Sequence, residues 1–133
     1  MATITREKIA KTNAKLANGF TVDIMSALRG EKMYSKDFVM PDGRTAQADV
    51  YYTSRYNRET GKEDSFPVVN FNYYSVDGAF RKSCGLGWTM KMRNEPVTRR
   101  TEKMLVELTK ELDDMACINF MIGLSSKCKN PMA

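Results

Sequence analysis

The sequence contains no histidine. Histidine is the general base of Ser-His-Asp and Cys-His active sites, a ligand of most catalytic zinc ions, and the side chain that titrates near neutral pH. The sequence therefore excludes these chemistries, and no pair of carboxylates stands out as buried. We expect a protein that is not an enzyme, with no cofactor and no metal site.

Cysteines are few, and none pairs at a metal-ligand spacing such as C-x-x-C. The three are Cys84, Cys117 and Cys128. The first two lie within apolar patterns and are predicted to be small core residues. Cys128, in a tail rich in serine and lysine, is interpreted as a free thiol. This usage is typical of a reducing compartment.

Long apolar runs are also missing. The longest candidate, residues 116–124, is interrupted by Asn119 and Gly123 and falls short of the roughly 18 residues needed to span a bilayer. The stretch from Thr5 to Lys15 is charged throughout, unlike a signal peptide. We expect no membrane partner and a cytoplasmic location, in the host cytoplasm if the source is viral.

The composition is that of a globular chain. Of the 133 residues, 42% are hydrophobic and 28% are charged, which predicts a single domain over 1–133. The net charge is +5 and the pI is about 9.2. An excess of positive charge favours an anionic partner, such as nucleic acid or an acidic protein.

The hydrophobic pattern changes period twice along the chain, which indicates an α+β fold. We expect helices over 5–28, an antiparallel sheet over 36–93, a long helix over 95–123 and a polar tail over 124–133. In the first region Ile9 and Leu16 lie near one stripe, the first helix stops near Asn18, and Thr21 caps a second helix through Leu28.

The sheet is predicted to be a four-stranded meander. Its strands are expected over residues 38–40, 45–57, 66–75 and 79–93. The turns are Pro41-Asp42-Gly43 and Asp77-Gly78, the second of which is the strongest hairpin signal in the chain.

The C-terminal helix is predicted to cover one face of the sheet through a single stripe, made of Leu105, Leu108, Leu112, Met115, Ala116 and Asn119. Its second half, residues 115–124, is apolar on nearly every side. It is therefore either clasped between the sheet and the N-terminal helix or part of a dimer seam. The ten methionines would make an adaptable surface, and we expect a homodimer through this helix.

Alternation divides the strands into an apolar face and a face that combines rings, amides and cations. Cations follow phosphates and rings stack on bases, so this mixture suits single-stranded nucleic acid. Arg99 and Arg100, expected in the first helical turn, oppose the helix dipole unless a phosphate or nearby acidic side chains compensate. The candidate nucleic-acid-binding residues are Tyr51, Arg55, Asn72, Tyr74, Lys91, Arg93, Arg99 and Arg100.

Two other interpretations of this face stay open. Such residues are ordinary on a solvated sheet face, and tyrosine and arginine are also enriched at protein interfaces. The order of sheet and long helix over residues 36–122 resembles the positive-cofactor type of single-strand-binding fold, in architecture alone. We expect a binder of single-stranded DNA or RNA. The alternatives are a small protein-binding inhibitor or adaptor, such as a viral accessory protein, and a structural virion component.

Overall fold

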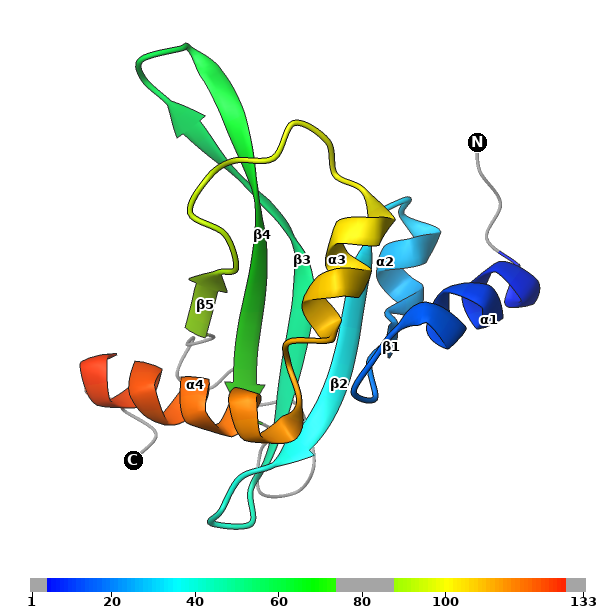
Figure 1. Ribbon diagram of the computed structural model, residues 1–133, viewed down its shortest axis with the longest axis vertical. Helices are drawn as coiled ribbons and strands as arrows, with labels where there is room; N and C mark the ends of the chain where they lie inside the picture. The colour runs from blue at the N-terminus through cyan, green and yellow to red at the C-terminus, as the bar shows by residue number, and fades with distance from the viewer. Residues whose placement is uncertain (1–4, 74–87, 129–133) are drawn as a thin grey trace.

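The computed structural model describes residues 5–73 and 88–128. The predicted α+β class is confirmed, because several helices accompany a five-stranded antiparallel sheet (Figure 1). The elements in chain order are α1 (Arg6–Lys15), β1 (Thr21–Val22), α2 (Ile24–Leu28), β2 (Met33–Val39), β3 (Thr45–Asn57), β4 (Lys62–Tyr73), β5 (Trp88–Lys91), α3 (Glu102–Thr109) and α4 (Asp114–Cys128).

The strands follow one another in the order β1-β2-β3-β4-β5, the meander that the sequence predicts. The predicted strand 45–57 coincides with β3. The turn at Pro41-Asp42-Gly43 is also confirmed, with Gly43 at a φ of +88° that favours glycine. The predicted turn at Asp77-Gly78 lies outside the described residues.

The prediction of four strands was wrong at the N-terminal side of the sheet. Thr21 does not cap a helix but begins β1, which pairs with Ser35 and Tyr34 of β2. The cap is Asp23, whose side chain accepts a hydrogen bond from the Ser26 N–H at 3.1 Å. Aspartate is an equally good capping residue, so the two residues before it are free to extend.

Two strand starts were also predicted too late. β2 begins at Met33 rather than residue 38, because Lys36 sits at a core position and interrupts the apolar alternation. β4 begins at Lys62 rather than residue 66. Its first residues pair with β3 near the tip of the hairpin, where the side chains are mostly polar. The sequence there shows no alternation of apolar and polar residues that would mark a strand.

The single long helix predicted over 95–123 is two helices. Thr101 caps α3, and the Asp113 side chain accepts a hydrogen bond from the Ala116 N–H at 2.8 Å, which starts α4 anew. Arg99 and Arg100 therefore precede the helix. Helix α4 continues through Cys128 into the predicted tail, because Gly123 lies inside the helix without the left-handed backbone of a C-cap.

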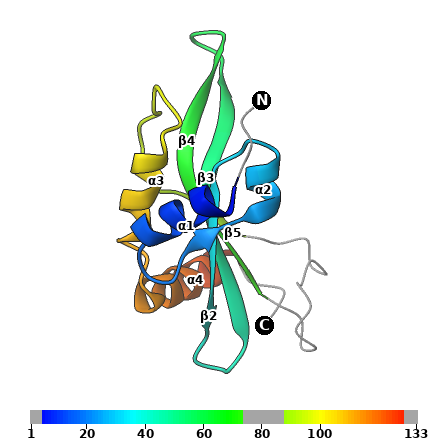
Figure 2. The ribbon, with the colours of Figure 1, turned by 90° about the vertical axis from the view of Figure 1, so that its right-hand side faces the viewer.

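Helices α3 and α4 cover one face of the sheet, which we call the inner face, and α2 lies on the side of the opposite, outer face (Figure 2). The leucines of the predicted stripe and Cys117 are buried in this core. Met115 and Asn119 are exposed, because α4 starts anew and turns them away from the sheet. No helix in the described part of the chain is long and apolar enough to cross a membrane. Core residues contributed by the strands, by α3 and α4 and by the connection between these helices include Tyr34, Phe38, Ala48, Val50, Val69, Phe71, Leu105, Leu108, Leu112, Cys117 and Met121.

The sheet is covered unevenly along its length. β3 pairs with β4 from Ala46 to Asn57, but it pairs with β2 only as far as Tyr51. Beyond Tyr51, the β3–β4 hairpin therefore projects past the rest of the sheet, as its upper end shows in Figure 1.

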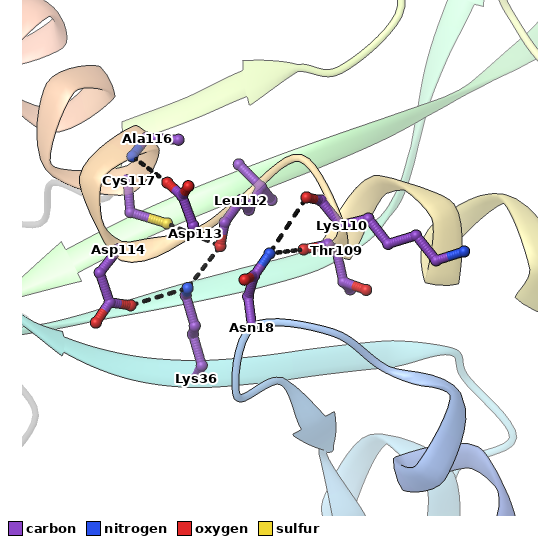
Figure 3. Close-up of polar contacts among 9 residues, drawn as sticks. All are labelled: Asn18, Lys36, Thr109, Lys110, Leu112, Asp113, Asp114, Ala116 and Cys117. Atoms are coloured by element: carbon purple, nitrogen blue, oxygen red, sulfur yellow. Dashed lines mark hydrogen bonds and ion pairs between the residues drawn. The ribbon is translucent and has the colours of Figure 1, made fainter.

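A buried lysine joins the sheet to the connection between α3 and α4 (Figure 3). The Lys36 side chain is 2% exposed, and its Nζ donates to the Leu112 carbonyl at 2.5 Å and to Asp114 Oδ1 at 3.0 Å. The same Nζ lies 5.0 Å from the centre of the Phe20 ring. A charge so far from water is stable only with such partners.

We predict that Lys36→Met lowers the free energy of unfolding by about 1–3 kcal/mol, because a buried carbonyl loses its donor. Asp114→Asn is the matched comparison, because it removes only the charge of a side chain that is 66% exposed and keeps an amide oxygen that can accept from Lys36 Nζ, so its loss should be smaller. Urea unfolding of both variants measures the difference. Equal losses would show that the ion pair, not the buried donor, matters.

Asn18, which is far from α3 in the sequence, caps the C-terminal end of this helix. Its backbone has a φ of +57°, and its Nδ2 donates to the carbonyls of Thr109 at 2.8 Å and Lys110 at 3.2 Å. We predict that Asn18→Ala lowers the free energy of unfolding by about 2–3 kcal/mol, through backbone strain and lost hydrogen bonds. Asn18→Gly loses the same hydrogen bonds but adopts the positive φ without strain, so it should lose less stability; a Gly variant as unstable as the Ala variant would contradict this division.

Candidate functional site

The centre of the outer face is acidic. Asp49 is 5% exposed, and its Oδ1 accepts hydrogen bonds from Ser35 Oγ at 2.7 Å and Gln47 Nε2 at 2.6 Å. Burial raises the pKa of Asp49, and the nearby carboxylates of Asp23 and Asp37 raise it further. A phosphate chain laid across this face would meet carboxylates there, which repel it.

Other predicted residues of this face are also engaged. Asn72 is buried, and Lys91 Nζ lies over the Phe66 ring at 4.3 Å from its centre. Phe66 itself is 7% exposed, so its ring does not form an open stacking surface. Tyr74 lies outside the described residues.

The predicted arginines occupy different places. Arg55 is exposed, on the same side of β3 as Tyr51, and its direct cross-strand neighbour is Asp64. Arg93 forms an ion pair with Glu111 at 2.9 Å, in the connection after α3. Arg99 is exposed in the segment before α3. The candidate residues therefore do not form one continuous sheet surface.

Two of the predicted residues do meet, at a cleft where β2 begins. The cleft has a volume of about 370 Å³. It brings Tyr51 and Arg100 together with Lys32, which the sequence pattern did not single out because the start of β2 was predicted too late. The lining residues are Gly30, Glu31, Lys32, Met33, Tyr51, Tyr52 and Arg100.

Hydrogen bonds to the hairpin hold Arg100 in this cleft. Its guanidinium donates to Ser65 Oγ at 3.0 Å and also to Ser54 Oγ, two side chains that are direct cross-strand neighbours. Next to it, the Tyr52 hydroxyl donates to the Thr101 carbonyl at 2.6 Å. Burial raises the pKa of Tyr52, so this hydroxyl stays a neutral donor at physiological pH.

The edge of β3 continues from the cleft with unpaired main-chain groups. Met40 and Arg44 are hydrogen bonded at the closed end of the β2–β3 ladder, and every second residue of β3 keeps that orientation. The N–H and C=O groups of Tyr52, Ser54 and Tyr56 therefore point away from β4. Within residues 5–73 and 88–128, no main-chain hydrogen bond reaches them. We call residues 52–57 the free edge.

The lower end of the free edge is cationic, because Lys32 and Arg100 line the cleft there. Along the edge itself Arg55 is exposed, and the cross-strand neighbours of Arg55 and Tyr56 are the acidic residues Asp64 and Glu63. Glu31 is the one acidic residue among the described residues that line the cleft, and its carboxylate lies 3.9 Å from Arg29, so a neighbouring cation offsets its charge. An anionic group is favoured at this place.

A second groove, between α1 and α3, also carries lysines. Lys15 pairs with Glu102 at 3.2 Å and Lys110 pairs with Glu107 at 3.2 Å, so two of its cations already have carboxylate partners. Among the residues that the structure describes, no group of histidine, cysteine, aspartate or glutamate is arranged to hold a metal ion.

Helix α4 has one buried side and one exposed apolar side. Cys117 and Met121 are buried against the sheet, while Met115 is 62% and Ile122 50% exposed on the opposite side. The predicted apolar run is thus buried on one side only. Formation of a homodimer through this helix stays a prediction.

We predict that Asp49→Asn stabilises the protein at pH 7, because the fold disfavours the ionised form of this buried carboxylate. The pKa of Asp49 is raised in the folded state, so the wild type regains stability as the pH falls through that pKa and the advantage of the variant shrinks. Urea unfolding from pH 7 to pH 4 measures the advantage.

Asp42→Asn is the control of opposite sign. Hydrogen bonds, first from the Arg44 N–H and also from its guanidinium, lower the pKa of Asp42. This variant should lose stability at pH 7, and the loss should shrink as the pH falls below the ordinary range of aspartate. An Asp49→Asn variant that behaved in the same way would contradict the assignment.

The cleft and the free edge form one site that combines two tyrosine side chains, cations and unpaired main-chain groups along a single strand of the sheet. The main-chain groups of the edge suit an extended chain, and the cations suit a negative charge at its lower end. The chain matches no protein-family model, no curated protein and no solved structure.

Proposed function

We propose that the protein is a non-enzymatic binding module that takes up an extended segment of a partner protein along the free edge of β3. The observation that carries the proposal is the row of unpaired main-chain groups at Tyr52, Ser54 and Tyr56, directly above a cationic cleft. An extended peptide adds to such an edge as a further strand, with main-chain hydrogen bonds as the source of affinity.

The length of the edge supports this proposal. Residues 52–57 span about 20 Å at the usual rise of a strand, enough for several residues of a bound segment. Tyr56 is 65% exposed, and Ser54 and Arg55 are exposed beside it, so a partner can approach this side of the hairpin. A role as an inhibitor or adaptor follows from such a site.

Charge indicates the kind of partner. The net charge of the chain is +5, and Lys32, Arg55 and Arg100 lie around the edge and the cleft. An acidic partner is attracted to this surface at long range, and the attraction weakens with salt.

Single-stranded nucleic acid is the second candidate. One observation favours it: the Tyr51 ring, Lys32 and Arg100 line the same cleft, where a base could stack and a phosphate could be contacted. The acidic centre of the outer face would confine such a strand to the cleft and the hairpin. Nucleic acid would make no use of the unpaired main-chain groups, and this difference provides a test.

The test replaces one donor of the free edge. Tyr56→Pro removes an N–H that points away from β4, and proline is tolerated on an edge strand, so the β3–β4 ladder keeps its hydrogen bonds. Tyr56→Ala is the matched control, because it removes the same side chain and keeps the N–H. The probes are a display library of random ten-residue peptides and a fluorescent single-stranded oligothymidine, each at two salt concentrations.

We predict that the wild-type chain selects acidic peptides, and that Tyr56→Pro weakens the selected peptides about tenfold or more while Tyr56→Ala keeps most of the affinity. Circular dichroism checks that all three proteins are folded. Selection of no peptide, together with salt-dependent oligothymidine binding that Tyr56→Pro leaves intact, would overturn the proposal in favour of nucleic acid.

A further inference from the structure

We infer that the site recognises the C-terminal carboxylate of its partner, an inference that rests on the proposed function. A segment that adds antiparallel to β3 runs in the same direction as β2, because β2 is itself antiparallel to β3. It therefore runs from the hairpin tip towards Met33. Its carboxyl end, not its amino end, arrives at the cleft.

A segment bound along the free edge cannot continue past the cleft as a strand. Below it, Met33 already occupies the position opposite Tyr51, and β2 fills the edge from there to the closed end of the ladder. The connection from α2 turns into β2 at Gly30, whose φ is +77°. A partner that continued past the cleft would have to turn away from the sheet, whereas a partner that ends there fits without a turn.

The charges select the carboxyl end. Lys32 and Arg100 line the cleft, and Arg100 is fixed on the inner side of the hairpin by the hydroxyls of Ser54 and Ser65. A guanidinium makes strong, directional hydrogen bonds with a carboxylate. A segment added in the parallel direction would bring an ammonium group to the same two cations, and like charges repel.

The same charges argue against a second copy of the chain as the occupant. Lys32, Arg55 and Arg100 lie around an edge of only about 20 Å. An antiparallel pair of two such edges would bring the Arg55 side chains of both copies close to each other, and like charges at a strand pair are destabilising. A partner with a free, acidic C-terminus is complementary where a second copy is not.

The experiment uses a library of peptides displayed with free C-termini and random in their last six positions, offered to the full chain. The tightest selected peptide is then synthesised as the free acid, as the C-terminal amide, and with two glycines appended. Fluorescence anisotropy measures each affinity. We expect the amide to bind on the order of 10- to 100-fold more weakly than the acid, since one charged hydrogen-bonding partner is lost.

Substitutions of the cleft cations test which side chains recognise the carboxylate. Arg100→Gln and Lys32→Gln should each reduce the ratio of acid to amide affinity, and the second variant leaves the hydrogen bonds of Arg100 to the hairpin in place. Lys103→Gln is the control, because Lys103 is exposed on α3 and lines the other groove. It should leave the ratio unchanged.

The outcomes separate this inference from the proposed function. If acid, amide and extended peptides bind equally and Tyr56→Pro still weakens their binding, the partner is held by the edge through an internal segment or an acidic side chain, and only the carboxylate inference fails. If Tyr56→Pro binds every peptide as the wild type does, or if no peptide is selected, the proposed function fails as well.

Discussion

The buried ammonium group of Lys36 is the interaction on which the other contacts depend. Lys36 lies in the middle of β2, on the inner face, and it donates to the chain at Leu112 and Asp114. The connection after α3 and the first turn of α4 are thereby fixed against β2 (Figure 3). An unpaired ammonium group at this buried position would be very unfavourable. The helix connection and the Phe20 ring must therefore lie close to β2, where they surround the Lys36 Nζ.

That arrangement leaves the two halves of β3 in different surroundings. From Thr45 to Tyr51 the strand lies between β2 and β4 and its inner face is covered by helices. From Tyr52 onwards β4 is the one strand that pairs with it among the described residues, and the segment before α3 touches the hairpin through Arg100 and Tyr52. The site lies at this boundary, where a strand loses its neighbour and a cation is already held in place.

Several features were visible in the sequence because they depend on neighbouring residues. The turn at Pro41-Asp42-Gly43, the bounds of β3 and the apolar stripe of α3 are of this kind. The break between α3 and α4 was missed, because the apolar stripe continues across it and the residue that ends α3 is Asn18, far away in the chain. The early start of β2 was missed because a lysine occupies a core position that is satisfied only by the helix connection.

The sequence by itself determined the fold class, the meander of antiparallel strands and the absence of histidine chemistry, since composition and local periodicity are enough for these. It also singled out Tyr51 and Arg100, but it placed Tyr51 on a sheet face with residues that the fold separates, and Arg100 in the first turn of a helix. Only the tertiary structure decided that Asp49 is buried at the centre of that face and that Arg100 reaches Ser54 and Ser65. The physical reason is that the end of β2, and with it the free edge of β3, is set by contacts between residues distant in the chain.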